Sequence, residues 1–577
     1  MRPESNYSGP PSGSRYKPFQ TQVLLDSVGL STNYGLDRSY SPKTGLAMHA
    51  RESLSRAAGV LWTTACLLMA QPSAPIRAWQ FHTLNIPYVK SALTVAPNYE
   101  VNTVVFSHEM IGYASQLFDG GDRGRQLTEL AAAAHAAKLT VWIWVREFEG
   151  VPDQFLLGGN LEIDWPGFWD WLRARYERIF DTYPGFDGVV LTFEESPYRV
   201  MDETKVQSSL SMAERFAKVI NVIDEVCRRY QKDLIVRSFL YEPEEMRWFQ
   251  EGYARTNPHV MIQTKCEPHD WDPFYPDDPM IGAFPKRRQI IEFDGSSEYT
   301  GKNRIPYTQP EYFERRWRHD LSQPGVVGYN IRVDHGGYDA LHTPNEINIY
   351  AMYRFTQDSR VTAADVWKEW TEMRYGSAAA REVEQALQPT FEIVNQSFFA
   401  LKFWVTNHSR LPDVRYANEH LHSRTLAKWY PSEPQYKVTE ERLLNPDPEL
   451  LEQILAEKDA AIAEAHRALL HLENARPHLT AAQYEDLYWR LSLEERTAVI
   501  WKLHAEAFFG YKVLAAGHRV PGMASRVQRA LEALRKEAAV GEADPRIGAD
   551  PPASAPEIRE FVNDLGGRVA QLAPGDR

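Results

Sequence analysis

The chain has 577 residues, a formal net charge of −13 and 43% apolar residues. This length indicates two or three domains, and the acidic balance argues against a nucleic-acid partner, because phosphate binding needs a basic surface. The three cysteines, none of them in a CxxC pair, exclude a disulfide framework and a cysteine-based metal site.

The first 75 residues divide into two predicted segments. Residues 1–47 are rich in Ser, Gly, Pro and Tyr, and we expect them to be disordered or loosely packed. Residues 48–75 place an apolar run behind Arg51 and Arg56, which is typical of a secretory signal peptide if translation starts at Met48. That interpretation predicts a secreted or periplasmic protein. The alternative is an amphipathic helix that plugs the bottom of a following barrel in a cytoplasmic protein. No other stretch is long and apolar enough to span a bilayer, so we expect no stable membrane insertion.

Eight short apolar or β-branched segments then predict strands buried on both faces. They are Ile76–His82, Val101–Ser107, Thr140–Arg146, Gly188–Phe193, Leu234–Leu240, Val260–Lys265, Gln289–Phe293 and Val326–Val333. Helical patterns alternate with them, so the repeated units favour an α/β fold with a parallel sheet. Eight such units favour closure into a (β/α)8 TIM barrel over residues 76–345. An open doubly wound sheet is the alternative, but no GxGxxG follows any of the strands.

Beyond residue 345 the sequence changes from alternating elements to long helical patterns. Apolar residues recur there at three- and four-residue spacing with no evident strand, which predicts an α-helical domain over residues 346–517. This domain is where we would expect a homodimer to form. Residues 518–577 predict one more helix, Arg526–Ala538, and a flexible tail rich in Pro and Gly.

Acidic side chains follow three of the predicted strands. Glu194 and Glu195 end the fourth strand, Asp270 follows the sixth and Glu298 follows the seventh. In a barrel the C-terminal strand ends converge on one mouth, so we expect these carboxylates to meet there. Adjacent residues of a strand point to opposite sides, so only one of Glu194 and Glu195 should face the pocket. Gathered carboxylates are what glycosidic bond cleavage requires, which predicts a glycoside hydrolase with an oligosaccharide substrate.

Other polar and aromatic side chains near the strand ends are expected to bind the substrate, since flat rings stack on sugar faces. They are Arg237, Lys265, His108, Trp144, Arg146, Tyr241, Trp271, Tyr299, Asn330 and Arg332. Arg237 is a charge inside an apolar strand, and a buried guanidinium needs an anion, either a neighbouring acid or a substrate carboxylate.

The histidines and cysteines suggest no cofactor. His108, His269 and His335 follow strands, but no HExxH or comparable spacing is present, so we expect no metal. Cys266 follows a strand as well and is interpreted as a small packing residue, because nothing nearby activates it as a nucleophile.

At these positions the chain resembles the α-glucuronidases of glycoside hydrolase family 67. QTKCEPHDWD, SEYTGK and VRSFLY correspond to family patterns like QIKNGPMDFQ, QEYTGQ and WRAFVY. NEINIYAMYRF and VWKEWTEMRYG look like the family's entry into its helical C-terminal domain. The similarity covers roughly Val101 to Gly376. The chain departs from the family where Ser196 occupies the strict position of the acid, and where Thr192 replaces a lysine.

The resemblance implies an exo-acting, inverting hydrolase that removes α-linked glucuronic or 4-O-methylglucuronic acid from plant-polysaccharide oligosaccharides such as those of xylan. Asp270 and Glu298 would activate water, and Glu194 or Glu195 would be the general acid. Arg237 and Lys265 match residues around the uronic carboxylate. Two alternatives stay open: a retaining, substrate-assisted hexosaminidase that uses the Glu194–Glu195 pair, and a carbohydrate-binding barrel without activity.

Overall fold

The computed structural model of the protein describes residues 75–572, apart from positions 113, 194, 241, 269–270, 406–407, 424–425 and 548–549. The predicted N-terminal segments, up to residue 74, therefore lie outside the described residues. So do four residues named above, Glu194, Tyr241, His269 and Asp270. Within the described part of the chain, no helix combines the length and the apolar character that crossing a membrane would need.

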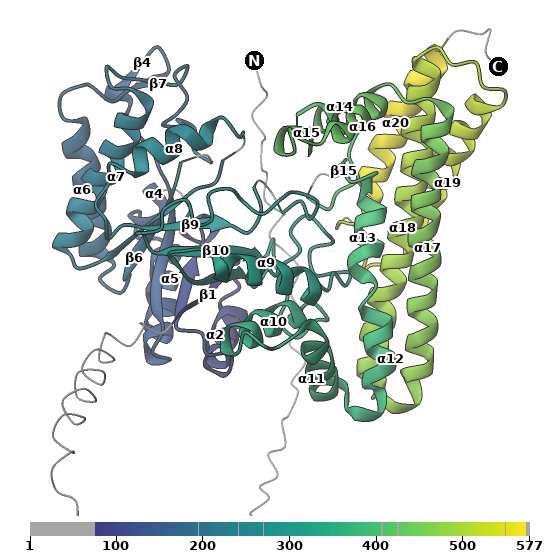
Figure 1. The fold of residues 1–577 in the computed structure, drawn as a ribbon, viewed down its shortest axis with the longest axis horizontal. Coiled ribbons are helices and arrows are strands. Elements are labelled where there is room, and N and C mark those ends of the chain that lie inside the picture. Colours follow the sequence, from purple (N-terminus) through teal and green to yellow (C-terminus); the bar gives the residue numbers. More distant parts are fainter. Residues whose placement is uncertain are drawn as a thin grey trace, which may run out of the picture. The chain divides into compact units, whose positions relative to one another are not determined.

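Eight parallel strands close into a barrel (Figure 1). They are β1 (Ile76–Phe81), β2 (Thr103–Phe106), β3 (Thr140–Arg146), β6 (Gly188–Thr192), β8 (Asp233–Arg237), β9 (Met261–Lys265), β10 (Gln289–Asp294) and β11 (Val326–Arg332). Their order around the barrel is β1-β11-β10-β9-β8-β6-β3-β2. Each predicted strand is present within a few residues of its expected bounds. The predicted (β/α)8 barrel is confirmed, and the open sheet is excluded.

Helices follow most strands and cover the outside of the barrel. They are α2 (Ile86–Val95), α5 (Asp122–Ala136), α6 (Phe168–Thr182), α7 (Met212–Arg229), α8 (Glu245–Tyr253), α9 (Pro310–Ser322) and α10 (Glu346–Gln357). Shorter elements at the strand ends include α3 (His108–Ile111), the three-stranded sheet of β4 (Leu156–Leu157), β5 (Asn160–Glu162) and β7 (Val206–Gln207), and the hairpin of β12 (Asp334–His335) and β13 (Tyr338–Asp339). Because α10 follows β11 and packs against α9, the barrel's last helix lies beyond residue 345, where the sequence predicted the boundary.

The interior of the barrel consists of an apolar layer and, above it, a polar layer. The apolar cluster contains Ile76, Ala78, Val105, Trp142, Trp144, Val190, Ile235, Met261 and Ile290. Side chains two residues apart on a strand point the same way. One step further along β1, β8, β9 and β10, the inward side chains are Gln80, Arg237, Gln263 and Glu292, all of them buried. The polar layer therefore lies at the C-terminal end of the barrel, where the mouth opens.

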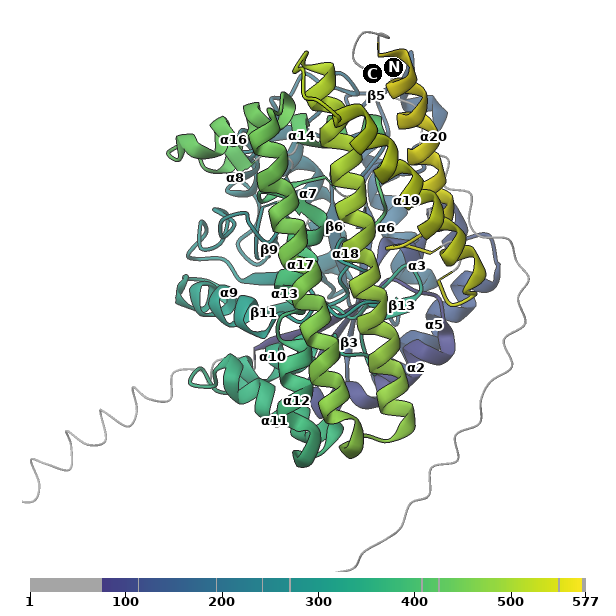
Figure 2. The same ribbon diagram turned by 90° about the vertical axis from the view of Figure 1, so that its right-hand side faces the viewer.

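The C-terminal region is helical, as predicted. It contains α11 (Ala363–Tyr375), α12 (Ser377–Leu387), α13 (Thr390–Phe398), α14 (Val414–Ser423), α15 (Leu426–Trp429), α16 (Pro434–Leu444), α17 (Pro448–Ala475), α18 (Ala481–Ala515), α19 (Met523–Ala543) and α20 (Ala555–Gln571). The long helices α17, α18 and α19 pack side by side (Figure 2).

Two predictions for this region were wrong. Helix α20 lies in the segment predicted to be a flexible tail, because Ile558, Phe561 and Leu565 recur at helical spacing and are buried. A short hairpin of β14 (Phe399–Ala400) and β15 (Phe403–Trp404) interrupts a stretch that was predicted to lack strands. It was too short to leave a two-residue alternation in the sequence.

Closure of the barrel depends on a glycine. Gly328 of β11 lies opposite Ile76 of β1, and a Cβ added to it would lie 2.0 Å from the Ile76 carbonyl oxygen. Gly328→Ala should therefore push the two strands apart and lower the free energy of unfolding by about 1–3 kcal/mol, as measured by denaturant titration. Gly567→Ala in α20 meets open space and should be neutral or slightly stabilising. Equal stability of the two variants would contradict this register.

Candidate active site

Five charged side chains form a continuous ion chain at the C-terminal mouth of the barrel. Arg237 donates from Nε to Glu292 Oε2 at 2.7 Å and from Nη2 to Oε1 at 3.0 Å. Arg332 donates from Nη2 to Glu292 Oε1 at 3.3 Å and from Nη1 to Glu298. At the other end, Arg237 Nη1 lies 3.5 Å from Glu195 Oε2. The charges thus alternate in the order Glu195, Arg237, Glu292, Arg332, Glu298.

Glu292 is the fully buried centre of this chain. Burial alone would raise its pKa, but the guanidinium groups of Arg237 and Arg332 outweigh burial and lower the pKa to about 2. The sequence left open whether the anion beside Arg237 was an acid or a substrate. The structure supplies an acid, held by two parallel hydrogen bonds of the kind that favours arginine over lysine.

Glu298 lies where three cationic or protonatable groups meet. Besides the bond from Arg332, His335 Nε2 lies 3.3 Å and His408 Nδ1 3.4 Å from Glu298 Oε1. Burial would raise the pKa of Glu298, but His335, Arg332 and His408 together hold it well below its ordinary value. The carboxyl is therefore ionised at neutral pH and can act as a base or nucleophile, not as a proton donor.

Part of this site comes from the helical region. His408 and Ser409 lie between β15 and α14, and both have left-handed backbone, with φ of 48° and 65°. The Ser409 hydroxyl donates to the carbonyl of Glu298 at 3.0 Å and accepts from the Gly301 amide at 2.8 Å. The His408 ring packs on Tyr299 with centroids 4.6 Å apart. Non-glycine residues in this conformation are uncommon, and they cluster at functional sites.

Aromatic rings and cations alternate on the wall of the mouth. The Arg237 guanidinium lies 4.4 Å from the ring centre of Trp144. Lys265 Nζ lies 4.0 Å from the ring centre of Phe239 and 4.6 Å from that of Trp271. Such cation–π contacts hold the long cationic side chains extended over the buried rings.

Histidines line the opposite part of the mouth, near β1, β2 and β11. His108 packs edge-on against Trp144 with centroids 4.3 Å apart. His82 Nδ1 lies 3.8 Å from Glu109 Oε2, and His335 Nε2 lies 3.5 Å from Glu109 Oε1. Donor atoms of His82, Glu109 and His335 all lie within 4.8 Å of one another, a spacing that could hold a metal ion. The sequence predicted no metal, because these three residues show no recognisable spacing along the chain.

Glu149, which follows β3, has an environment opposite to that of Glu298. Burial raises the pKa of Glu149 above its ordinary value, although Arg146 Nη1 lies 3.4 Å away. Burial thus favours the protonated form of Glu149, whereas the surroundings of Glu298 favour its charged form.

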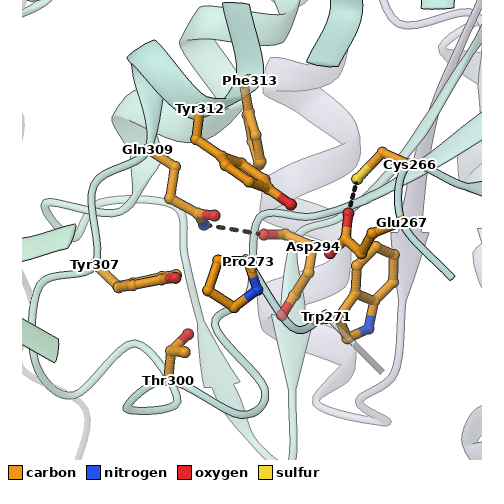
Figure 3. A pocket seen from close by; sticks show the side chains of 10 residues that line it. All are labelled: Cys266, Glu267, Trp271, Pro273, Asp294, Thr300, Tyr307, Gln309, Tyr312 and Phe313. Carbon is orange, nitrogen blue, oxygen red and sulfur yellow. Dashed lines mark hydrogen bonds between the residues drawn. The ribbon is translucent and has the colours of Figure 1, made fainter. Parts of the chain in front are cut away.

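A small cavity lies under the loops that follow β9 and β10 (Figure 3). Its volume is about 10 Å³, room for roughly one water molecule, so a sugar ring cannot enter it. Cys266 lines the cavity and donates its thiol to Glu267, and burial raises the pKa of that thiol well above its ordinary value. The thiol is therefore not a nucleophile, in agreement with its interpretation as a packing residue.

Most of the predicted site residues lie at the barrel's C-terminal end. The described ones are Glu195, Glu298, Arg237, Lys265, His108, Trp144, Arg146, Trp271, Tyr299, Asn330 and Arg332. Glu194, Asp270 and Tyr241 lie outside the described residues, so their roles remain predictions.

Sequence reasoning missed Glu292, Glu109, Glu149, His82 and His408. Glu292 did leave a signal in the sequence, because it is a charged residue in the apolar run IIEF of a buried strand. It could have been predicted as the acid that the buried Arg237 needs. His408 left no signal, since it comes from the helical region.

No protein-family model matches this chain, and a search of curated proteins found no match. Among solved structures, the chain is similar to a "GH138 enzyme targeting pectin rhamnogalacturonan II", with a TM-score of 0.57 and 10% identity over 89% of this chain and 69% of that one. It is also similar to "CpGH84B", with a TM-score of 0.40 and 11% identity over 86% of this chain and 77% of that one. The first likeness supports the fold, and the second is too weak to support any inference. Neither shows membership of family 67.

The pairing of Arg237 with Glu292 predicts a large effect on stability. Arg237→Met removes one cation from a buried ion pair and should lower the free energy of unfolding by roughly 3–5 kcal/mol in a urea titration. Arg173→Met breaks solvent-accessible pairs with Asp170 and Glu225 and should cost at most about 1 kcal/mol. An Arg237→Met protein as stable as this control would indicate that Arg237 serves a ligand and not Glu292.

Proposed function

We propose that this protein is a glycoside hydrolase whose reaction takes place at the C-terminal mouth of the barrel. The observation that carries the proposal is the ionised Glu298, held by Arg332, His335 and His408 in the loop after β10. Glu195 lies at the other end of the same ion chain, with 26% of its side chain exposed. Glycosidic cleavage uses two carboxyl groups that flank the scissile bond as its catalytic groups. The barrel shared with a GH138 enzyme supports the same class.

In this proposal Glu298 is the base or the nucleophile, since its surroundings keep it charged. The proton donor comes from the neighbouring strand ends. The sequence favours the Glu194–Glu195 pair for this role, and the structure adds Glu149, whose pKa is raised by burial. The donor must protonate the leaving oxygen, so a carboxyl whose pKa is raised suits that step better than one whose pKa is lowered.

For the substrate we propose an acidic plant polysaccharide, with α-linked glucuronic or 4-O-methylglucuronic acid as the sugar removed. The resemblance of the strand-end motifs supports this choice, and the solved structure named above targets pectin rhamnogalacturonan II. Arg237 is an unsuitable anchor for the sugar carboxylate, because its guanidinium already binds Glu292 and Glu195. Lys265, whose ammonium lies over Phe239 and Trp271, is the other cation that the motif resemblance assigns to this carboxylate.

A panel of aryl α- and β-glycosides, including glucuronides and neutral sugars, tests both the hydrolase class and the uronic-acid substrate. We expect release of the aryl group from an α-glucuronide and none from the neutral glycosides, with product NMR showing an inverted anomer. Cleavage of a neutral glycoside alone would support the hydrolase class but contradict the proposal that the substrate is a uronic acid. The absence of cleavage across a broad panel of natural oligosaccharides as well would contradict the hydrolase.

Glu298→Gln tests the central residue. The amide has nearly the same size but no charge, so kcat should fall by roughly 10²- to 10⁴-fold while KM changes little. Glu129→Gln, on the outer helix α5 with 55% of the Glu129 side chain exposed, is the matched control and should leave both constants unchanged. Full turnover in Glu298→Gln would remove Glu298 from the mechanism.

A further inference from the structure

A chain of side-chain amides crosses the barrel interior from Glu292 to His82. Gln263 Nε2 donates to Glu292 Oε2 at 2.8 Å. Asn330 Nδ2 donates to Gln263 Oε1 at 3.2 Å and to Gln80 Oε1 at 2.7 Å. Gln80 Nε2 then lies 2.9 Å from His82 Nε2. All three amide residues are at most 1% exposed, so bulk water does not compete for these bonds.

Glu292 sets the direction of every bond in this chain. An ionised carboxylate only accepts hydrogen bonds, so Gln263 must turn its NH₂ group towards Glu292. The Gln263 oxygen then faces Asn330, whose NH₂ group has two hydrogens, one for Gln263 and one for Gln80. Reversing any single amide would bring two oxygens or two NH₂ groups together. Gln80 is therefore left with its NH₂ group facing His82.

The direction of the chain decides which nitrogen of His82 carries the proton. Facing an NH₂ group, His82 Nε2 must accept. Burial and the nearby cation Arg332 hold the pKa of His82 well below its ordinary value, so the ring is neutral and has one N–H. That hydrogen is consequently on Nδ1, since the bond made by one ring nitrogen determines the state of the other. His82 Nδ1 is buried and has no hydrogen-bond partner among the described residues.

We propose that the amide chain keeps His82 as a hydrogen-bond donor at Nδ1, so that His82 and Glu109 together bind a ligand hydroxyl and not a metal ion. The gap of 3.8 Å between His82 Nδ1 and Glu109 Oε2 is too long for a direct hydrogen bond. A hydroxyl between them could accept from His82 and donate to Glu109. A metal ion would instead need a lone pair on Nδ1 and a proton on Nε2, facing the NH₂ group of Gln80.

A sugar hydroxyl fits this donor–acceptor pair, and that part of the inference rests on the proposed glycoside hydrolase activity. The tautomer of His82 does not depend on it. Metal-binding histidines donate their second N–H to a carboxylate or carbonyl oxygen, and His82 faces the reverse arrangement. Replacing the amide of Gln80 with a carboxylate should therefore turn the cluster of His82, Glu109 and His335 into a metal site.

Zinc titration of the full-length protein tests this reversal. In Gln80→Glu the new carboxylate can accept from both Asn330 and His82 Nε2–H, which leaves a lone pair on Nδ1. Calorimetry with Zn²⁺ alone should show one additional equivalent bound by Gln80→Glu, and its loss in the double variant Gln80→Glu/Glu109→Gln. Wild-type protein and Glu109→Gln should bind Zn²⁺ identically. A wild-type zinc site that Glu109→Gln removes would overturn the proposal.

A second measurement uses the wild-type protein and does not depend on the folding of Gln80→Glu. With ¹⁵N-labelled histidine, the signals of His82 are those missing from a His82→Asn variant. We expect the shift of a protonated nitrogen for Nδ1 and that of an unprotonated nitrogen for Nε2, and the reverse would overturn the proposal. If the protein cleaves no glycoside, the hydrolase proposal fails, while the zinc and ¹⁵N results still decide the tautomer.

Discussion

The pairing of Glu292 with two guanidinium groups is the interaction on which the rest of the site depends. An unpaired carboxylate inside the barrel would cost several kcal/mol, and so would each unpaired arginine. Arg237 and Arg332 neutralise Glu292, but two cations around one anion leave an excess of positive charge. Glu195 and Glu298 offset that excess at the two ends of the chain, so that each guanidinium lies between two carboxylates. The two carboxylates therefore lie at the C-terminal end of the barrel, with Glu195 partly exposed and Glu298 buried.

The same carboxylate also organises uncharged groups. Through three amides its negative charge determines the direction of hydrogen bonds as far as His82, on the other side of the barrel interior. Buried polar networks of this kind are stable only when the bonds are satisfied in one consistent direction. The mouth therefore presents cations over aromatic rings on one side, and imidazole groups beside Glu109 on the other. A saccharide, with many hydroxyls that both donate and accept, suits a surface of this composition.

The helical region takes part in the site, so the barrel does not carry it alone. His408 contacts the Glu298 carboxylate, and Ser409 bridges the backbone on either side of Tyr299. Arg304, in the loop after β10, donates to the carbonyls of Asp550 and Pro551 just before α20. These contacts connect the loop that holds Glu298 to two separate parts of the C-terminal helices. Changes in the helical region should therefore affect the proposed reaction by shifting the Glu298 carboxylate.

The sequence by itself determined the eight strands, the closed barrel and the helical region after it. It also identified Arg237 as a charge within an apolar strand and Glu298 as an acid that follows a strand. These follow from local patterns, because apolar spacing within a few residues decides whether a segment is a strand or a helix. Only the tertiary structure decided that Arg237 pairs with Glu292, that His408 reaches Glu298, and that amides connect Glu292 to His82. Those contacts join residues from different strands and from the helical region. They exist only once strand order and register bring the side chains to the same height in the barrel, which no local pattern encodes.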